Sequence, residues 1–67
     1  MTQISIRAAR VNAGLTLEDV SKQTNISAYT LGKYEKGESM PKWDVFVNLC
    51  RIYNVPVTDI FIPTSSS

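Results

Sequence analysis

The chain has 67 residues and a formal net charge of +1, which place it in the size range of one small domain. Hydrophobic residues make up 43% and charged residues 19%, a composition typical of a globular rather than a disordered chain. There is no His and a single Cys, Cys50, so a zinc finger, a disulfide framework and a Cys–His nucleophile pair are excluded. We expect no metal, no cofactor and no catalytic residues.

The single cysteine also indicates a reducing compartment, because small secreted domains usually depend on several disulfides. The apolar runs at residues 45–47 and 60–62 are far shorter than the ~18 residues of a membrane-spanning helix. Residues 1–4 contain no basic region leading into an apolar one, as a secretion signal would. These features predict a cytoplasmic protein that does not enter a membrane.

Four residues that tolerate a left-handed backbone each follow an apolar segment: Gly14, Asn25, Gly37 and Asn54. Gly, and less often Asn, closes the C-terminal end of a helix in this conformation. The spacing therefore predicts four helices joined by short links.

Start signals alternate with these stops. Thr16 and Ser27 each precede a helical pattern and can accept a hydrogen bond from a backbone amide of the first turn. Pro41 ends a loop before a fourth helix, and Pro56 restarts the chain before a short fifth helix. We expect a compact all-α domain of five helices over residues 1–63 and a flexible tail at 64–67.

The apolar residues recur with the three-to-four-residue period of a helix, and no alternation indicates a strand pair. Cys50 lies on this stripe, so core filling is expected of it rather than redox chemistry. Phe61 and Ile62 either close the core or form part of a two-fold dimer contact. The expected core is Ile6, Ala9, Ala13, Leu17, Val20, Leu31, Tyr34, Trp43, Phe46, Leu49, Cys50, Tyr53, Val57 and Ile60.

Residues 15–37 describe two helices joined by a tight turn. Ser21 is small enough for the second helix to approach closely. Asn25 tolerates the left-handed backbone of the turn, and Ile26 packs at the junction of the two helices. Leu31 and Tyr34 pack the second helix back on the first. This arrangement is typical of a helix-turn-helix motif, in which the second helix presents its outer face to a groove.

At this point the sequence resembles the lambda-repressor/Cro-like helix-turn-helix family, the XRE type, over roughly residues 4–62. The resemblance rests on Arg10, Gly14-Leu15-Thr16, Ile26-Ser27, Tyr34-Glu35-Lys36-Gly37 and Pro41. It implies a five-helix bundle that binds double-stranded operator DNA as a dimer. It also implies an ion pair between Arg10 and Glu35 that ties the first helix to the end of the third.

This chain departs from the family's pattern at three positions. Leu17 stands where the family often has a Gln that contacts phosphate, and Glu38 stands where it often has Lys or Arg. Gly32 lies inside the recognition helix, where it costs about 0.5–1 kcal/mol relative to Ala and offers no side chain to a base.

The candidate DNA-binding residues lie on or near the helix at residues 28–36. Lys neutralises phosphate and reaches guanine acceptors, and hydroxyl groups bond either phosphates or bases. A solvated helix face, a dipole-complementing Lys36 and an ordinary surface Lys42 are the alternative interpretations. The set is Ser27, Ala28, Tyr29, Thr30, Gly32, Lys33, Lys36 and Lys42.

Two functions remain open on the sequence. The first is a phage- or mobile-element-type transcriptional regulator that inserts residues 28–36 into the major groove of its operator. The second is an antirepressor or modulator that uses the same surface to bind a partner repressor, which the near-neutral charge, Leu17, Gly32 and Glu38 favour. An enzyme is not expected, because six scattered acids and no His offer no catalytic cluster.

Overall fold

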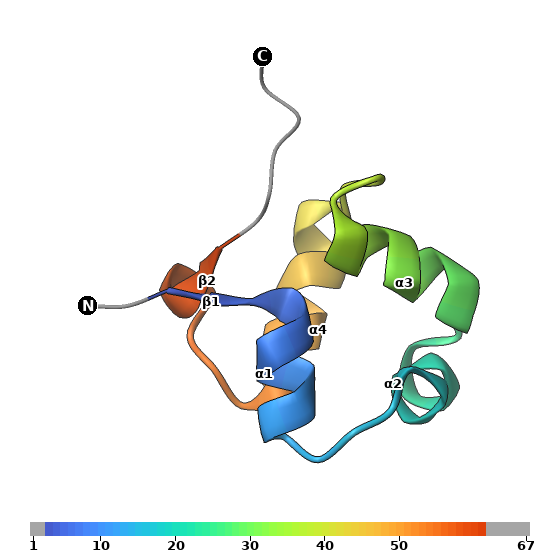
Figure 1. The fold of residues 1–67 in the computed structure, drawn as a ribbon, viewed down its shortest axis with the longest axis horizontal. Helices are drawn as coiled ribbons and strands as arrows, with labels where there is room; N and C mark the ends of the chain where they lie inside the picture. The colour runs from blue at the N-terminus through green and yellow to red at the C-terminus, as the bar shows by residue number, and fades with distance from the viewer. Residues whose placement is uncertain (1–2, 62–67) are drawn as a thin grey trace.

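The computed structural model of the protein describes residues 3–61. In chain order its elements are β1 (Ile4–Ser5), α1 (Ile6–Asn12), α2 (Leu17–Thr24), α3 (Ala28–Lys36), α4 (Trp43–Tyr53), the 3-10 turn η1 (Val57–Asp59) and β2 (Ile60–Phe61). Figure 1 shows α1 in front of α4, with α2 and α3 on one side and the strands on the other. The expected tail at 64–67 and Ile62 lie outside the described residues. No helix in the described part is long and apolar enough to cross a membrane.

The four stop signals are confirmed by the backbone. Gly14, Asn25, Gly37 and Asn54 have φ angles of 75°, 61°, 78° and 59°, all in the left-handed region. At the end of α4, the amide of Val55 donates to the carbonyl of Cys50 at 3.0 Å, which satisfies one of the last carbonyls of the helix. The predicted helix ends therefore follow from local backbone chemistry.

The helix starts also follow from side-chain caps. Thr16 Oγ1 accepts from the amide of Asp19 at 3.1 Å, and Asp19 Oδ2 accepts from the amide of Thr16 at 2.9 Å, which completes a capping box at α2. The hydrogen bond from the Thr16 backbone lowers the pKa of the Asp19 carboxyl. Ser5 caps α1 in the same way by accepting from the amide of Ala8 at 3.0 Å.

The prediction of a fifth α-helix is wrong. After Pro56 the chain makes only the three-residue turn η1, and Ile60 is then extended at φ −102° and ψ 128°. The strand β2 pairs in parallel with β1, with Ile4 opposite Ile60. Ile60 still reaches the core, but it does so from a strand rather than from a helix face. Two-residue strands are too short to show an alternating pattern in sequence.

The core is built by one face of each helix and by Ile60. Its two largest fully buried side chains are Leu49 on α4 and Val20 on α2. Five predicted core residues are not fully buried. Leu17, Tyr34 and Val57 are half-buried and pack against the core, whereas Ala13 is exposed beyond the end of α1 and Trp43 is 68% exposed. Burial raises the pKa of the Cys50 thiol, in keeping with the packing role expected for it. The buried residues are Ile6, Ala9, Val20, Leu31, Phe46, Leu49, Cys50, Tyr53 and Ile60.

Burial of Tyr53 predicts a loss of stability at alkaline pH. Desolvation raises the pKa of the Tyr53 phenol to about 12, from an ordinary value of 10.0. Above pH ~10 the unfolded chain loses this proton more readily than the folded chain, so the free energy of unfolding falls until the pH reaches the folded pKa. We expect Tyr53 to contribute a decline of about 1.4 kcal/mol per pH unit across this window.

Urea unfolding at several pH values between about 9 and 12 measures this decline. The matched variants are Tyr53→Phe, which should remove the Tyr53 contribution, and Tyr29→Phe, whose phenol is 77% exposed and should leave the decline unchanged. A wild-type protein and a Tyr53→Phe variant with the same alkaline slope would contradict the assignment.

Candidate nucleic-acid interface

The turn between α2 and α3 is fixed by polar contacts at Thr24. Its hydroxyl donates to the carbonyl of Val20 at 2.8 Å and accepts from the amide of Ile26 at 3.2 Å. Asn25 takes the left-handed conformation between these two bonds. Ile26 packs against the core cluster. The turn therefore sets the direction in which α3 leaves α2.

Both ends of α3 are capped. Ser27 Oγ accepts from the amide of Thr30 at 3.1 Å and donates to Thr30 Oγ1 at 3.0 Å. At the other end, Gly37 is left-handed and the amide of Glu38 donates to the carbonyl of Lys33 at 3.0 Å, as in a Schellman motif. Ser27, a candidate DNA contact, thus has a structural role as the N-cap of α3.

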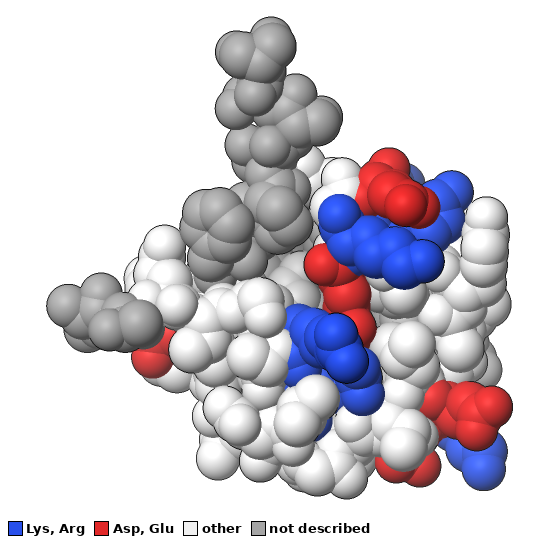
Figure 2. Space-filling model, in the orientation of Figure 1, with Lys and Arg blue, Asp and Glu red and all other residues white. Residues whose placement is uncertain are grey.

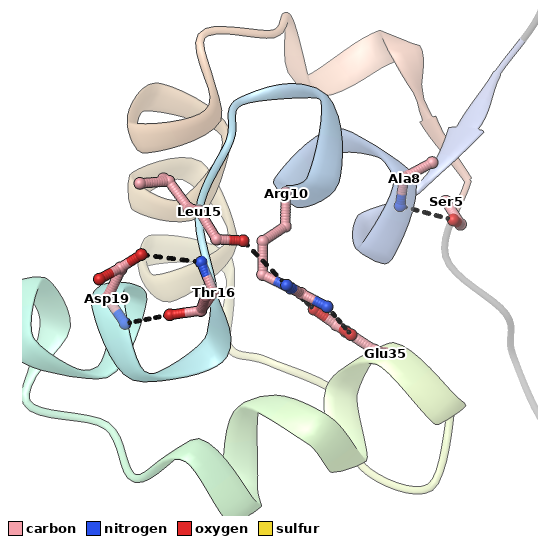
Figure 3. A network of polar contacts seen from close by, with 7 residues as sticks. All are labelled: Ser5, Ala8, Arg10, Leu15, Thr16, Asp19 and Glu35. Atoms are coloured by element: carbon pink, nitrogen blue, oxygen red, sulfur yellow. Dashed lines mark hydrogen bonds and ion pairs between the residues drawn. The ribbon is translucent and has the colours of Figure 1, made fainter.

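Arg10 joins α1 to the C-terminal part of α3 (Figure 3). Its Nε donates to Glu35 Oε2 at 2.7 Å, its Nη2 donates to Glu35 Oε1 at 3.3 Å, and its Nη1 donates to the carbonyl of Leu15 at 2.9 Å. The side chains of Arg10 and Glu35 are only 12% and 8% exposed. The hydrogen bond that Arg10 donates to Glu35 raises the pKa of the Arg10 guanidinium. The ion pair implied by the family resemblance is present and holds α3 against α1.

The side of α3 that faces away from Leu31 carries the exposed candidates. Tyr29 is 77% exposed, Lys36 is exposed, and Lys33 is half-buried. The ammonium of Lys33 lies 5.4 Å from the centre of the Tyr29 ring. Ala28 and Thr30 are half-buried at the first turn. This surface of α3 is open to a partner, whereas Leu31 is 2% exposed in the core.

Gly32, another candidate DNA contact, is half-buried and lies at the edge of this surface. A Cβ built at Gly32 would lie 3.9 Å from Leu17 Cδ1, so this side of α3 faces the start of α2. There it borders an open depression of about 290 Å³ between α1, α2 and α3. The residues around the depression are Arg7, Arg10, Leu17, Gly32, Glu35 and Lys36.

A family model described as a helix-turn-helix domain matches residues 5–60, the span that contains this arrangement. The chain belongs to the helix-turn-helix family. Its likeness to the XRE type is thereby confirmed. It is also similar to a protein of Archaeoglobus fulgidus described as an uncharacterized HTH-type transcriptional regulator, with 30% identity over 57 residues, which cover 85% of this chain and 81% of the relative. No solved structure matches the chain significantly.

In this helix-turn-helix domain the link from α3 to α4 forms a second exposed region. Lys42 is exposed and starts α4 without a side-chain cap, directly after Pro41. Met40 and Trp43 are 56% and 68% exposed. The centre of the Trp43 ring lies 5.8 Å from that of the Phe46 ring, so the two side chains are neighbours on α4, as their spacing predicted. Trp43 stands at the first position of α4, where the helix extends past the core.

Cationic side chains do not form a continuous strip on the face shown in Figure 2. One group of Lys and Arg lies over α1 and another over the C-terminal part of α3, with acidic side chains between them and at the α3–α4 link. Further cationic surface lies among acidic side chains near α2. Electrostatics alone therefore do not define a nucleic-acid surface on this face, and any such surface depends on individually placed side chains.

Sequence reasoning missed the depression because its residues come from three helices. Arg7 was not among the candidate site residues, and Leu17 was predicted as a core residue and noted as a departure from the family pattern. Their meeting with Lys36 depends on the angles between helices, which no local pattern encodes. Among the described residues, no three His, Cys, Asp or Glu side chains come together to hold a metal ion.

Proposed function

We propose that the protein is a DNA-binding transcription regulator that inserts α3 into the major groove. The observation that carries the proposal is a row of outward-facing side chains on a helix that is fixed at both ends in a helix-turn-helix domain. Tyr29 and Lys36 in this row are exposed, and Lys33 is half-buried. An α-helix fits the major groove, where base edges present a distinct pattern for each base pair. The description of the A. fulgidus relative as a transcriptional regulator supports the same function.

In this proposal Tyr29, Thr30 and Lys33 contact the base edges, and other residues contact the phosphates. Ala28 and Thr30 are small enough to let the first turn of α3 approach the base edges. Lys36 and Arg7 line the depression beside α3 and are placed to neutralise backbone phosphates, as is Lys42 at the start of α4. Leu17 and Gly32 add only apolar surface and backbone there, so fewer phosphate contacts are expected than in a strongly basic domain.

Dimeric binding to a near-palindromic operator is part of the proposal, because two half-sites one helical turn apart match a two-fold protein dimer. The phage- or mobile-element-type class and the cytoplasmic location remain predictions from the sequence. Analytical ultracentrifugation with a duplex of two half-sites, compared with one half-site, tests the dimer.

Salt-dependent affinity tests the proposed phosphate contacts. Fluorescence anisotropy of a labelled duplex from the region upstream of the gene, at salt concentrations from about 50 to 200 mM, yields the slope of log Kd against log salt. Each phosphate contact contributes a slope of about 0.9, so Lys36→Ala should lower the slope by about 1 and weaken binding to all sequences alike.

The matched control is Arg51→Gln, which also removes one exposed positive charge but does so in the last turn of α4. It should leave the slope unchanged. If Lys36→Ala and Arg51→Gln reduce affinity equally, only net charge matters and the proposed contact is wrong. Absence of binding at about 50 mM salt would refute the DNA-binding function itself.

The second candidate function is binding to a partner repressor through the same surface. The interleaved acids in Figure 2 disfavour a polyanionic partner such as DNA. The exposed aromatic rings of Tyr29 and Trp43 favour a protein partner, because the centres of protein interfaces are rich in aromatic residues. Co-purification of products of the neighbouring genes with the wild-type protein, lost in Tyr29→Ser, would support this candidate. If the Tyr29→Ser variant still co-purified such a partner, the surface around Tyr29 would be excluded as the binding site.

A further inference from the structure

Tyr29 and Lys33 form one structural unit on the exposed side of α3. They are four residues apart on the helix, so their side chains leave the same face. The Lys33 ammonium lies 5.4 Å from the centre of the Tyr29 ring, within the range of a cation–π contact. The ring is 77% exposed, whereas Lys33 is half-buried, so its stem is partly covered.

This contact limits the freedom of both side chains before any ligand is bound. A lysine alone on a helix surface samples many rotamers, and ordering it on binding costs free energy. Here the ring and the ammonium already share one arrangement, with an apolar surface and a positive charge at a defined separation. A partner that offers an apolar group and an acceptor at a matching separation fits this unit.

The major groove contains one apolar group and one strong pair of acceptors. The apolar group is the C5-methyl of thymine, and the acceptors are O6 and N7 of guanine, which Lys contacts. Successive base pairs lie about 3.4 Å apart along the axis. The 5.4 Å between the ring centre and the ammonium therefore spans one to two base-pair steps.

We propose that Tyr29 and Lys33 together select a thymine that lies one or two base pairs from a guanine. Tyr29 packs against the thymine methyl and Lys33 donates to the guanine acceptors. This proposal rests on the DNA-binding function and adds the base-pair preference of α3. Neighbouring Ala28 and Gly32 leave the unit free of competing long side chains on α3.

Selection from a library of random duplexes, followed by replacement of single thymines with deoxyuridine, tests this preference. Enriched duplexes should contain the thymine–guanine spacing. Deoxyuridine lacks only the methyl group, so its substitution at that thymine should weaken wild-type binding about fourfold, the effect of burying one such group. Tyr29→Phe should keep this ratio, because it keeps the ring. Tyr29→Ser should bring the ratio to about one, and Lys33→Met should lose the guanine preference.

The outcomes separate this proposal from the function on which it rests. Duplex binding with equal affinity for thymine and deoxyuridine would overturn the base preference and leave DNA binding in place. An undiminished deoxyuridine effect in Tyr29→Ser would assign the methyl contact to another residue and overturn the proposal. Failure of every duplex to bind at about 50 mM salt would overturn both. Since Tyr29 is largely exposed, its variants should fold, which far-UV circular dichroism checks.

Discussion

Replacement of Arg10 by Met should lower the free energy of unfolding by about 3–5 kcal/mol, the cost of leaving a buried charge without its partner. Glu35 is 8% exposed and accepts two hydrogen bonds from Arg10. The variant therefore leaves the Glu35 carboxylate buried without a positively charged partner. The carbonyl of Leu15 loses its bond from Arg10 as well. A domain of this size has a total stability of about 3–10 kcal/mol, so this loss removes much or all of it.

Urea unfolding of the wild type and variants, followed by circular dichroism, measures this loss. The control is Arg7→Met, which removes an exposed Arg from the same helix and should cost under about 0.5 kcal/mol. The double variant Arg10→Met, Glu35→Leu should recover most of the loss, because no charge then stays buried. If Arg10→Met unfolded at the same urea concentration as the wild type, the ion pair would contribute nothing to holding α3 against α1.

The second large effect is expected at Leu49. Its side chain is 2% exposed and is one of the largest fully buried groups of the domain. Leu49→Ala removes buried methyl groups and leaves a cavity, so the free energy of unfolding should fall by about 2–5 kcal/mol. The cost approaches the upper limit if the surrounding helices, fixed by their caps, do not collapse into the space.

Thermal and urea unfolding of Leu49→Ala beside Val11→Ala tests this expectation. Val11 is 56% exposed on α1, so shortening it removes apolar atoms without opening a cavity. Its stability should remain within about 0.5 kcal/mol of the wild type. Equal losses in the two variants would show that Leu49 does not occupy the packed centre of the domain.

The parts of the fold that could be predicted from sequence are those set by local chemistry. The left-handed residues Asn25 and Gly37 and the N-caps Thr16 and Ser27 act within a few residues, so their positions give the helix boundaries directly. The helix-turn-helix pattern of residues 15–37 predicted α3 as an outward-facing helix. The helical period was sufficient to predict the buried core residues wherever other elements cover a helix along its whole length.

The errors occurred where distant segments decide the outcome. Ile60 was expected on a helix, but pairing with Ile4, far away in the chain, draws it into a strand. Trp43 continues the apolar period of α4, but no other element covers the first turn of that helix sufficiently to bury it. The position of Gly32 beside Leu17, at the edge of the depression, likewise depends on the angle between α2 and α3, which carries no local signal. Each of these features depends on tertiary geometry.

The most direct test of the central claim is an NMR titration of the ¹⁵N-labelled protein with the upstream duplex at about 50 mM salt. If α3 is the surface that enters the groove, the largest amide shifts should fall at residues 27–36 and at Lys42. Residues of β1, η1 and β2, on the other side of the domain, should change little. The largest shifts in those strands, or no shifts in α3 at saturation, would contradict the account.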